Sequence, residues 1–189
     1  MSLLKKKFNK RITWQDYLSW PDDERWEVID GVAYYMSPSP TSRHQVIAGN
    51  FYSILKDKLK GNPCKVFIAP LDVCFDDYNF VQPDVLVVCD DKKIKEKICG
   101  APDLIIEVLS PATSLKDKRE KKALYEKFQV REYIVIDPEG MIVEKNCLIS
   151  GRFKGPFILG NTEVLRLASL EKMEVPLWEV FEVEKPEEQ

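Results

Sequence analysis

The chain has 189 residues, of which 44% are hydrophobic and 31% charged. This length and composition are typical of one globular domain over residues 1–189 with a sizeable core, and we expect flexible ends over residues 1–12 and 184–189. The formal net charge of -3 and the pI of about 5.4 exclude a strongly basic field. Any contact with nucleic acid must therefore be local.

The cysteines are odd in number and show no Cys-x-x-Cys spacing. Most of them lie in apolar runs, which favours buried, reduced thiols over a disulfide framework. The five are Cys64, Cys74, Cys89, Cys99 and Cys147. Reduced thiols indicate a cytoplasmic protein, and no apolar window approaches the length of a membrane span. We therefore expect a soluble protein without a membrane partner.

The first third of the chain predicts a short helix, a hairpin and a long helix. Thr13 is placed to cap a helix that ends near Ser19. Two strand-like segments, 25–29 and 32–36, flank Asp30-Gly31, a pair that suits a two-residue turn with positive φ. Apolar residues between Thr41 and Lys60 recur at helical spacing, which predicts an amphipathic helix.

The rest of the chain predicts mainly strands. Segments 64–69 and 71–75 form two strands, or one strand broken at Pro70, and lead through a turn to a strand at 80–88, giving a three-strand meander. A strand, a helix and a strand follow at 103–109, 113–129 and 132–137, and antiparallel strands are expected at 141–149, 152–159 and 162–167. Leu115, Leu124 and Phe128 are available for packing on the second long helix. The fold class is therefore α+β with a mixed sheet.

Two acidic residues lie inside strands that are otherwise apolar. Asp84 follows Pro83 in the first of these strands, and Glu107 lies near the end of the run from Pro102 to Pro111. An ionised carboxylate is costly to bury, so Glu107 needs a metal, a cation or a proton. Mg²⁺ is commonly held by only one or two protein carboxylates. We expect Asp84 and Glu107 to converge on one site of this kind.

The helix after Glu107 offers a cation. Asp117, Lys121 and Tyr125 are spaced i, i+4 and i+8 and so share one face. If this face meets the end of the Glu107 strand, the Lys121 ammonium can orient an attacking water or stabilise an oxyanion, while Mg²⁺ or Mn²⁺ lowers the pKa of bound water.

These residues together resemble the Uma-two family of putative restriction endonucleases, within the PD-(D/E)XK nuclease superfamily. The resemblance rests on their order and spacing and covers about residues 13–181. Its motifs are Pro83-Asp84, Glu107-Val108-Leu109-Ser110-Pro111, Asp117, Lys121, Tyr125, Glu132 to Pro138, Glu27 to Gly31, Met36 to Pro40 and His44. The resemblance implies an αβββαβ core, bound Mg²⁺ and phosphodiester cleavage. It also implies that Asp84 and Glu107 are metal ligands. Leu109 occupies the usual lysine position of the superfamily, so the resemblance transfers that role to Lys121.

Each of these residues also has a structural interpretation. Asp84 can satisfy a backbone group, and Lys121 can be an exposed ion-pair partner of Asp117. Glu27 can be a solvated residue or a third carboxylate of the site. His44, the only histidine, is more often packed or capping than a base. Lys122, the next residue on the helix, stays open as an alternative to Lys121 for the catalytic role.

Two functions follow. The first is a Mg²⁺-dependent nuclease that acts on nucleic acid, with DNA as the expected substrate. The second is a non-catalytic module of the same fold that binds nucleic acid or protein, which the acidic pI and Leu109 favour. A homodimer is compatible with either function.

Overall fold

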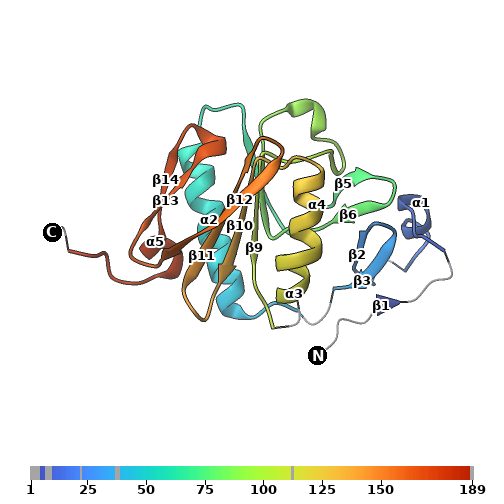
Figure 1. The fold of residues 1–189 in the computed structure, drawn as a ribbon, viewed down its shortest axis with the longest axis horizontal. Helices are drawn as coiled ribbons and strands as arrows, with labels where there is room; N and C mark the ends of the chain where they lie inside the picture. Colours follow the sequence, from blue (N-terminus) through green and yellow to red (C-terminus); the bar gives the residue numbers. More distant parts are fainter. Residues whose placement is uncertain (1–4, 7–9, 22, 37–38, 112, 188–189) are drawn as a thin grey trace.

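The structure is a computed structural model that describes residues 5–6, 10–21, 23–36, 39–111 and 113–187. The described part contains two six-stranded sheets; the one with the longer strands, here called the larger sheet, lies at the centre with helices packed beside it (Figure 1). The N-terminal sheet lies at one end of the molecule, and the C-terminal strands lie at the other (Figure 1).

The larger sheet has six strands in the order β12-β11-β10-β9-β7-β4. Their bounds are β4 Lys65–Ile68, β7 Val85–Val88, β9 Leu104–Val108, β10 Glu132–Asp137, β11 Ile142–Ile149 and β12 Arg152–Gly160. β9 and β10 are parallel, and every other neighbouring pair is antiparallel. The parallel pair is the expected strand, helix and strand unit.

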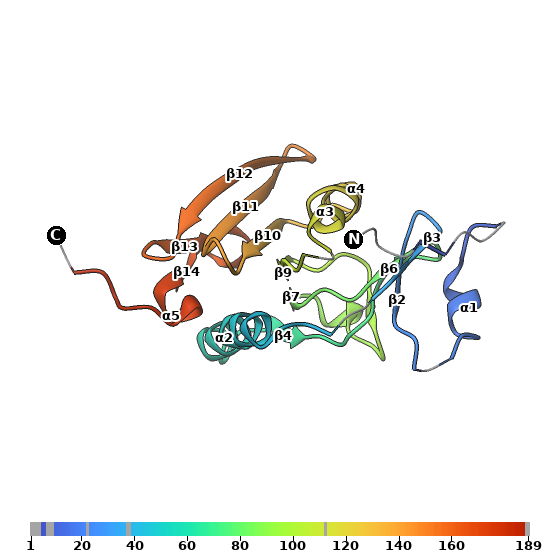
Figure 2. The ribbon, with the colours of Figure 1, turned by 90° about the horizontal axis from the view of Figure 1, so that it is seen from below.

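Helices cover both faces of this sheet (Figure 2). α2, Ser42–Lys58, begins after its cap Thr41 and lies on one face. On the other face lies one continuous helical stretch made of α3 Ser114–Lys116, the π-helical segment η2 Asp117–Lys121 and α4 Lys122–Lys127. In chain order, α2, β4, β7, β9, this helix and β10 form the expected αβββαβ arrangement.

The smaller sheet contains the N-terminal hairpin and has the order β1-β3-β2-β6-β5-β8. Its strands are β1 Lys5–Lys6, β2 Trp26–Ile29, β3 Val32–Tyr35, β5 Val73–Asp76, β6 Asn79–Val81 and β8 Ile98–Cys99. The short helix α1, Trp14–Tyr17, has the expected Thr13 cap. η1, Asp91–Lys93, is a single 3₁₀ turn before β8.

The expected three-strand meander is wrong. β4 pairs with β7 in the larger sheet, whereas β5 pairs with β6 in the smaller one. The chain changes sheets near Pro70 and again near Pro83, because a proline cannot donate to a ladder of hydrogen bonds. The second change of sheet places Asp84 directly before β7.

The C-terminal part adds a small hairpin and a helix. β13 Val164–Leu167 pairs with β14 Met173–Pro176, not with β12 as the sequence suggested. The 3₁₀ turn η3, Ala168–Leu170, connects the two strands, and α5 Leu177–Phe181 packs against α2. Within the described part of the chain, no helix combines the length and the apolar character that a bilayer crossing requires.

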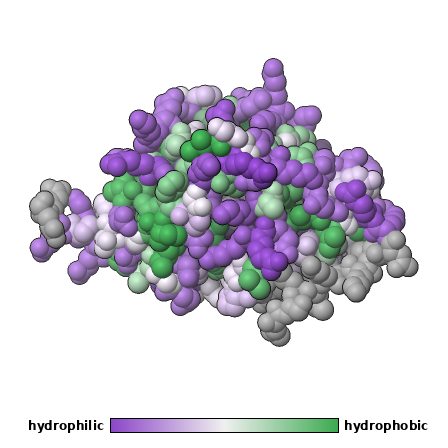
Figure 3. Space-filling view, viewed as in Figure 1, coloured by the Kyte–Doolittle hydropathy of each residue, from purple (hydrophilic) through white to green (hydrophobic). Residues whose placement is uncertain are grey.

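Apolar side chains fill the space between each helix and the larger sheet. Ile47, Phe51 and Leu55 of α2 pack on one face, and Leu124 of α4 packs on the other. The expectation that Leu115 would also pack is wrong, because this side chain is exposed. The surface seen in Figure 3 is mainly hydrophilic, with apolar side chains gathered over the C-terminal elements.

The expectation of reduced thiols is wrong for one pair of cysteines, because Cys64 and Cys89 form a disulfide. Lys65 of β4 pairs with Val88 of β7, so the next residue outward on each strand faces the other. Cys74, Cys99 and Cys147 are free. The cysteines therefore support a cytoplasmic location only through the three free thiols.

The turn of the N-terminal hairpin gives a stability prediction. Asp30 and Gly31 both have positive φ, and a Cβ built on Gly31 would lie 2.7 Å from the Cβ of Arg11. We expect Gly31→Ala to lower the free energy of unfolding by about 1–2 kcal/mol or more. Gly49→Ala in α2, where a Cβ meets nothing within 4 Å, should instead raise it by about 0.5–1 kcal/mol. Urea denaturation measures both, and equal changes would contradict this account of the turn.

Candidate active site

Glu107 lies on β9 in the centre of the larger sheet, and only 3% of its surface is exposed. One carboxylate oxygen, Oε1, accepts hydrogen bonds from Lys121 Nζ at 2.8 Å and Tyr125 Oη at 2.7 Å. Both partners come from the helix that covers this face of the sheet. Among the described residues no hydrogen bond reaches its second oxygen, Oε2. Glu107 therefore has one oxygen held by the protein and one left for another partner.

Asp84 directly precedes β7, the neighbour of β9 in the sheet, and so lies beside Glu107. Val85 pairs with Ile106, so Asp84 and Glu107 are the next opposed positions of β7 and β9. Asp84 Oδ2 accepts a hydrogen bond from the Val108 backbone N–H at 2.8 Å, and its side chain keeps 19% of its surface exposed. Asp84 is therefore the more accessible of the two carboxylates.

His44 supports Asp84 from the first turn of α2. Its Nε2 lies 3.1 Å from Asp84 Oδ2, whereas its Nδ1 is buried with no hydrogen-bond partner among the described residues. Burial lowers the pKa of His44, but the Asp84 carboxylate outweighs burial and raises it overall. His44 is therefore a packed residue that also orients Asp84.

Glu27 is a fully buried third carboxylate. β2 carries it to the helix, where Lys121 Nζ lies 2.7 Å from its Oε1 and Lys116 forms an ion pair with its Oε2. The Gln82 backbone N–H also donates to Oε1 at 3.1 Å. The solvated interpretation of Glu27 is therefore wrong, and Lys121 bridges Glu27 and Glu107.

The π-helical segment explains why two lysines reach the same carboxylate. Residues five apart point in different directions on an α-helix, but the wider i→i+5 turn of a π-helix brings them closer to one face. Lys116 and Lys121 are five apart: Lys116 directly precedes the segment Asp117–Lys121, and Lys121 is its last residue. Lys116 belongs to a visible cluster of basic residues, but α-helical spacing does not place it on the face of Lys121, so the sequence pattern did not predict its role.

The two buried glutamates differ in charge state. Burial alone would raise the pKa of Glu27, but Lys116 and Lys121 lower it to about 2. Burial raises the pKa of Glu107 to about 8, because Lys121 offsets burial only in part and Asp117, Asp84 and Glu27 repel its charge. In the absence of a bound cation, Glu107 therefore holds a proton at neutral pH, whereas Glu27 is ionised.

Asp117 is the fourth carboxylate of the cluster and lies next to Lys121. Its Oδ1 lies 3.6 Å from Lys121 Nζ and is buried without a hydrogen-bond partner among the described residues. Burial raises the pKa of Asp117 and raises that of the Tyr125 hydroxyl well above its usual value. The buried face of the helix is therefore short of positive charge.

The charge balance of the cluster fits a divalent cation. Four carboxylates, Glu27, Asp84, Glu107 and Asp117, meet only two ammonium groups, Lys116 and Lys121. Leaving His44 aside, two negative charges are left over when all six groups are ionised, and in the metal-free state the proton on Glu107 offsets one of them. No group of three or more metal-ligating side chains converges within the described ranges. The oxygen donors of Asp84 and Glu107 do suit Mg²⁺, which needs one or two carboxylates and completes its shell with water.

The structure brings the candidate residues of the sequence together around Glu107. Lys121, Asp117, Tyr125 and Glu27 lie in one buried cluster, and Asp84 with His44 lies at its more exposed side. The exposed interpretation of Lys121 is wrong, since only 3% of its surface is exposed. Lys122 is outside the cluster and is only partly buried. The catalytic and metal-binding roles of these residues stay predictions.

Comparison with known proteins identifies the family. Residues 14–177 match the family model described as "Putative restriction endonuclease", the Uma-two family. The chain belongs to this family. This match confirms the resemblance carried by the sequence motifs and covers the whole candidate site.

Two relatives extend the comparison. An uncharacterized protein of Synechocystis sp., slr1290, is 30% identical over 119 residues, which is 61% of this chain and 62% of that protein. A crystal structure titled as a putative nuclease from Anabaena variabilis superposes with a TM-score of 0.74 at 20% identity, covering 90% of this chain and 98% of that one. The structural likeness confirms the α+β fold expected for the family.

Proposed function

We propose that this member of the putative restriction endonuclease family is a Mg²⁺-dependent nuclease that hydrolyses phosphodiester bonds in DNA. The observation that carries the proposal is the position of Asp84 and Glu107 at opposed ends of β7 and β9, beside the fixed ammonium of Lys121. Family membership supports the same reaction class. Mn²⁺ is the expected substitute for Mg²⁺, because it also accepts oxygen ligands.

In this proposal the residues of the chain have distinct tasks. Asp84 and Glu107 would hold the cation, which supplies an activated water and neutralises charge on the phosphate. Lys121, fixed by Glu27 and Glu107, donates hydrogen bonds toward the attacking water or the phosphoryl oxygens. Tyr125 orients Glu107, and His44 orients Asp84. Lys116 neutralises Glu27, so that Lys121 is not its sole partner.

A metal titration tests the proposal. Supercoiled plasmid and labelled oligonucleotides, both DNA and RNA, are incubated with the protein in EDTA, Mg²⁺ or Mn²⁺. Cleavage of DNA only in the presence of metal is the expected result. Cleavage of RNA but not DNA would show that RNA is the substrate. No cleavage of either nucleic acid would favour the non-catalytic function.

Thermal unfolding supplies a readout that does not depend on cleavage. At a metal concentration a hundredfold above Kd, binding should stabilise the fold by about 2.7 kcal/mol and raise Tm by roughly 5–10 °C. The cation competes with the proton of Glu107, whose pKa is about 8, so the rise should be larger at pH 8.5 than at pH 6.5. An unchanged Tm at millimolar metal, or an equal rise in Asp84→Asn, would argue against metal binding at this site.

The second candidate is a non-catalytic module that binds nucleic acid or protein. One observation favours it, namely that Lys121 and Tyr125 already occupy Oε1 of the Glu107 carboxylate. If no cation binds the other oxygen, the cluster serves stability alone. In that case binding to DNA would be unaffected by EDTA and by Glu107→Gln.

A further inference from the structure

β4 is an edge strand of the larger sheet, and its outer side is open within the described part of the chain. The Ala69 N–H donates to the Asp84 carbonyl at 2.9 Å, so the backbone groups of Ala69 point toward the chain of β7. Because backbone groups alternate along an antiparallel strand, the N–H and C=O groups of Val66 and Ile68 point away from β7. None of the described hydrogen bonds outside the ladder uses their N–H groups. Asn62 Oδ1 accepts from the Cys64 N–H at 2.9 Å and so closes one end of this edge.

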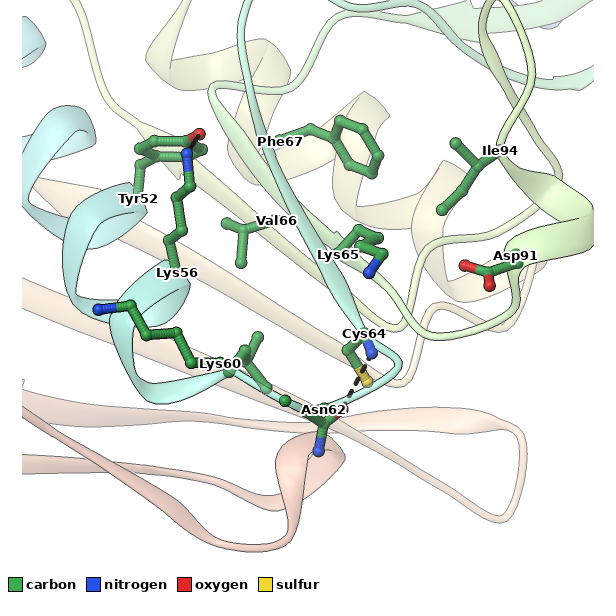
Figure 4. A pocket seen from close by; sticks show the side chains of 12 residues that line it. Tyr52, Lys56, Lys60, Asn62, Cys64, Lys65, Val66, Phe67, Asp91 and Ile94 are labelled. Carbon is green, nitrogen blue, oxygen red and sulfur yellow. Dashed lines mark hydrogen bonds between the residues drawn. The ribbon is translucent and has the colours of Figure 1, made fainter.

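A groove of about 680 Å³ runs beside this open edge, between the end of α2 and the turn η1 (Figure 4). Its lining includes the apolar side chains Tyr52, Leu59, Val66, Phe67 and Ile94. A groove with a strand edge on one side and a helix on the other is the geometry in which an extended peptide joins a sheet. Backbone bonds then hold the peptide, and alternate side chains enter the groove.

The charge of the groove selects the kind of peptide. Three lysines, Lys56, Lys60 and Lys65, line it against one acid, Asp91. Lys60 is paired with Asp57, but among the described residues neither Lys56 nor Lys65 has a carboxylate within 4 Å. Lys56 instead donates to the Tyr52 hydroxyl at 2.9 Å and lies near its ring (Figure 4). A second copy of β4 would bring like charges together, so self-pairing is disfavoured.

We propose that this groove binds an extended acidic segment of a partner protein, which adds to the sheet as a strand beside β4. Nucleic acid would satisfy the lysines but would leave the open backbone groups and the apolar lining unused. The groove lies at the opposite end of α2 from His44, and a 17-residue helix is about 25 Å long. The partner would therefore leave the candidate active site uncovered, and this inference does not depend on the proposed function.

Fluorescence polarisation with a labelled octapeptide of alternating Glu and Val tests the inference on the full chain. We expect saturable binding that weakens by about tenfold or more in Lys56→Glu and in Lys65→Glu. Lys58→Glu is the matched control, because Lys58 is exposed on the same helix but does not line the groove. Its affinity should stay within about twofold of the wild type. An equal loss of affinity in all three variants would indicate non-specific electrostatic attraction of the acidic peptide and would overturn the proposal. Binding that does not saturate would overturn it as well.

The backbone contribution needs its own test. Two further peptides carry N-methyl groups on every Glu or on every Val, so that only one of them loses the N–H groups facing β4. We expect one peptide to bind about tenfold or more weakly and the other to retain its affinity. Equal affinities would exclude strand addition. Displacement of the peptide by a single-stranded oligodeoxynucleotide that binds more tightly would assign the groove to nucleic acid instead.

Discussion

Glu107→Gln is expected to abolish metal-dependent cleavage, with a loss of kcat/KM of about a thousandfold or more. The amide keeps the shape of the side chain and an oxygen that can accept from Lys121 and Tyr125. It lacks the negative charge that a cation needs. The metal-induced rise in Tm should disappear together with the activity. Glu96→Gln, at an exposed position, is the control and should behave like the wild type.

The same substitution is expected to stabilise the protein in EDTA at high pH. The pKa of Glu107 is raised from 4.5 to about 8 on folding. Below pH 4.5 both states hold the proton, and as the pH rises toward 8 only the native state holds it, so stability falls. The loss is of the order of a few kcal/mol above pH 8, and it is absent from the variant because an amide side chain does not titrate.

Chemical denaturation of both proteins at pH 5, 7 and 9 measures this difference in unfolding free energy. The advantage of the variant should grow with pH. A constant difference across these pH values would show that Glu107 does not hold a proton in the metal-free fold. Cleavage by the variant at the wild-type rate would remove Glu107 from the mechanism.

Lys121→Ala is expected to lower the free energy of unfolding by about 3–5 kcal/mol at pH 9 and to abolish cleavage. The sequence alone suggested a small effect on stability, because an exposed ion pair with Asp117 contributes little. The structure corrects this expectation, since Lys121 is buried and bridges Glu27 and Glu107. Its removal leaves the buried Glu107 carboxylate without an ammonium partner, whereas Glu27 keeps Lys116. The cost should be smaller at pH 6, where Glu107 is protonated.

Two further variants separate catalysis from stability. Lys122→Ala, one position along the helix and outside the cluster, should change stability by about 0.5 kcal/mol at most and remain active. Lys121→Arg keeps the charge but not the position of the ammonium, so it should retain more stability than Lys121→Ala while cleavage falls by about a hundredfold. Urea denaturation and cleavage assays below the melting range give both quantities. Full activity in Lys121→Ala would exclude this lysine from the reaction.

Local patterns in the sequence were sufficient to predict the elements that form the centre of the fold. Helical spacing predicted α2, and the Asp-Gly pair predicted the hairpin turn. The apolar run around Glu107 predicted a buried acid in need of a partner, and i, i+4 spacing identified Lys121 as that partner. Each of these signals lies within a few residues of the chain, where periodicity and turn chemistry are strong guides.

Features that depend on distant pairing could not be predicted in this way. Nothing local indicates that β4 pairs with β7, so the opposition of Cys64 and Cys89 was not visible. The burial of Glu27 depends on a helix that begins far along the chain. Lys116 was hidden because the π-helical segment departs from α-helical spacing.

The ion pair between Glu27 and Lys116 has a consequence for the order of events during folding. The two residues are separated by 89 positions, and contacts across such long stretches form late because a large loop must close first. The N-terminal hairpin must dock on an already assembled strand and helix before the acidic cluster is complete. A refolding experiment should therefore show early burial of β9 and its helix, followed by a slower step in which the hairpin docks and Glu27 meets Lys116.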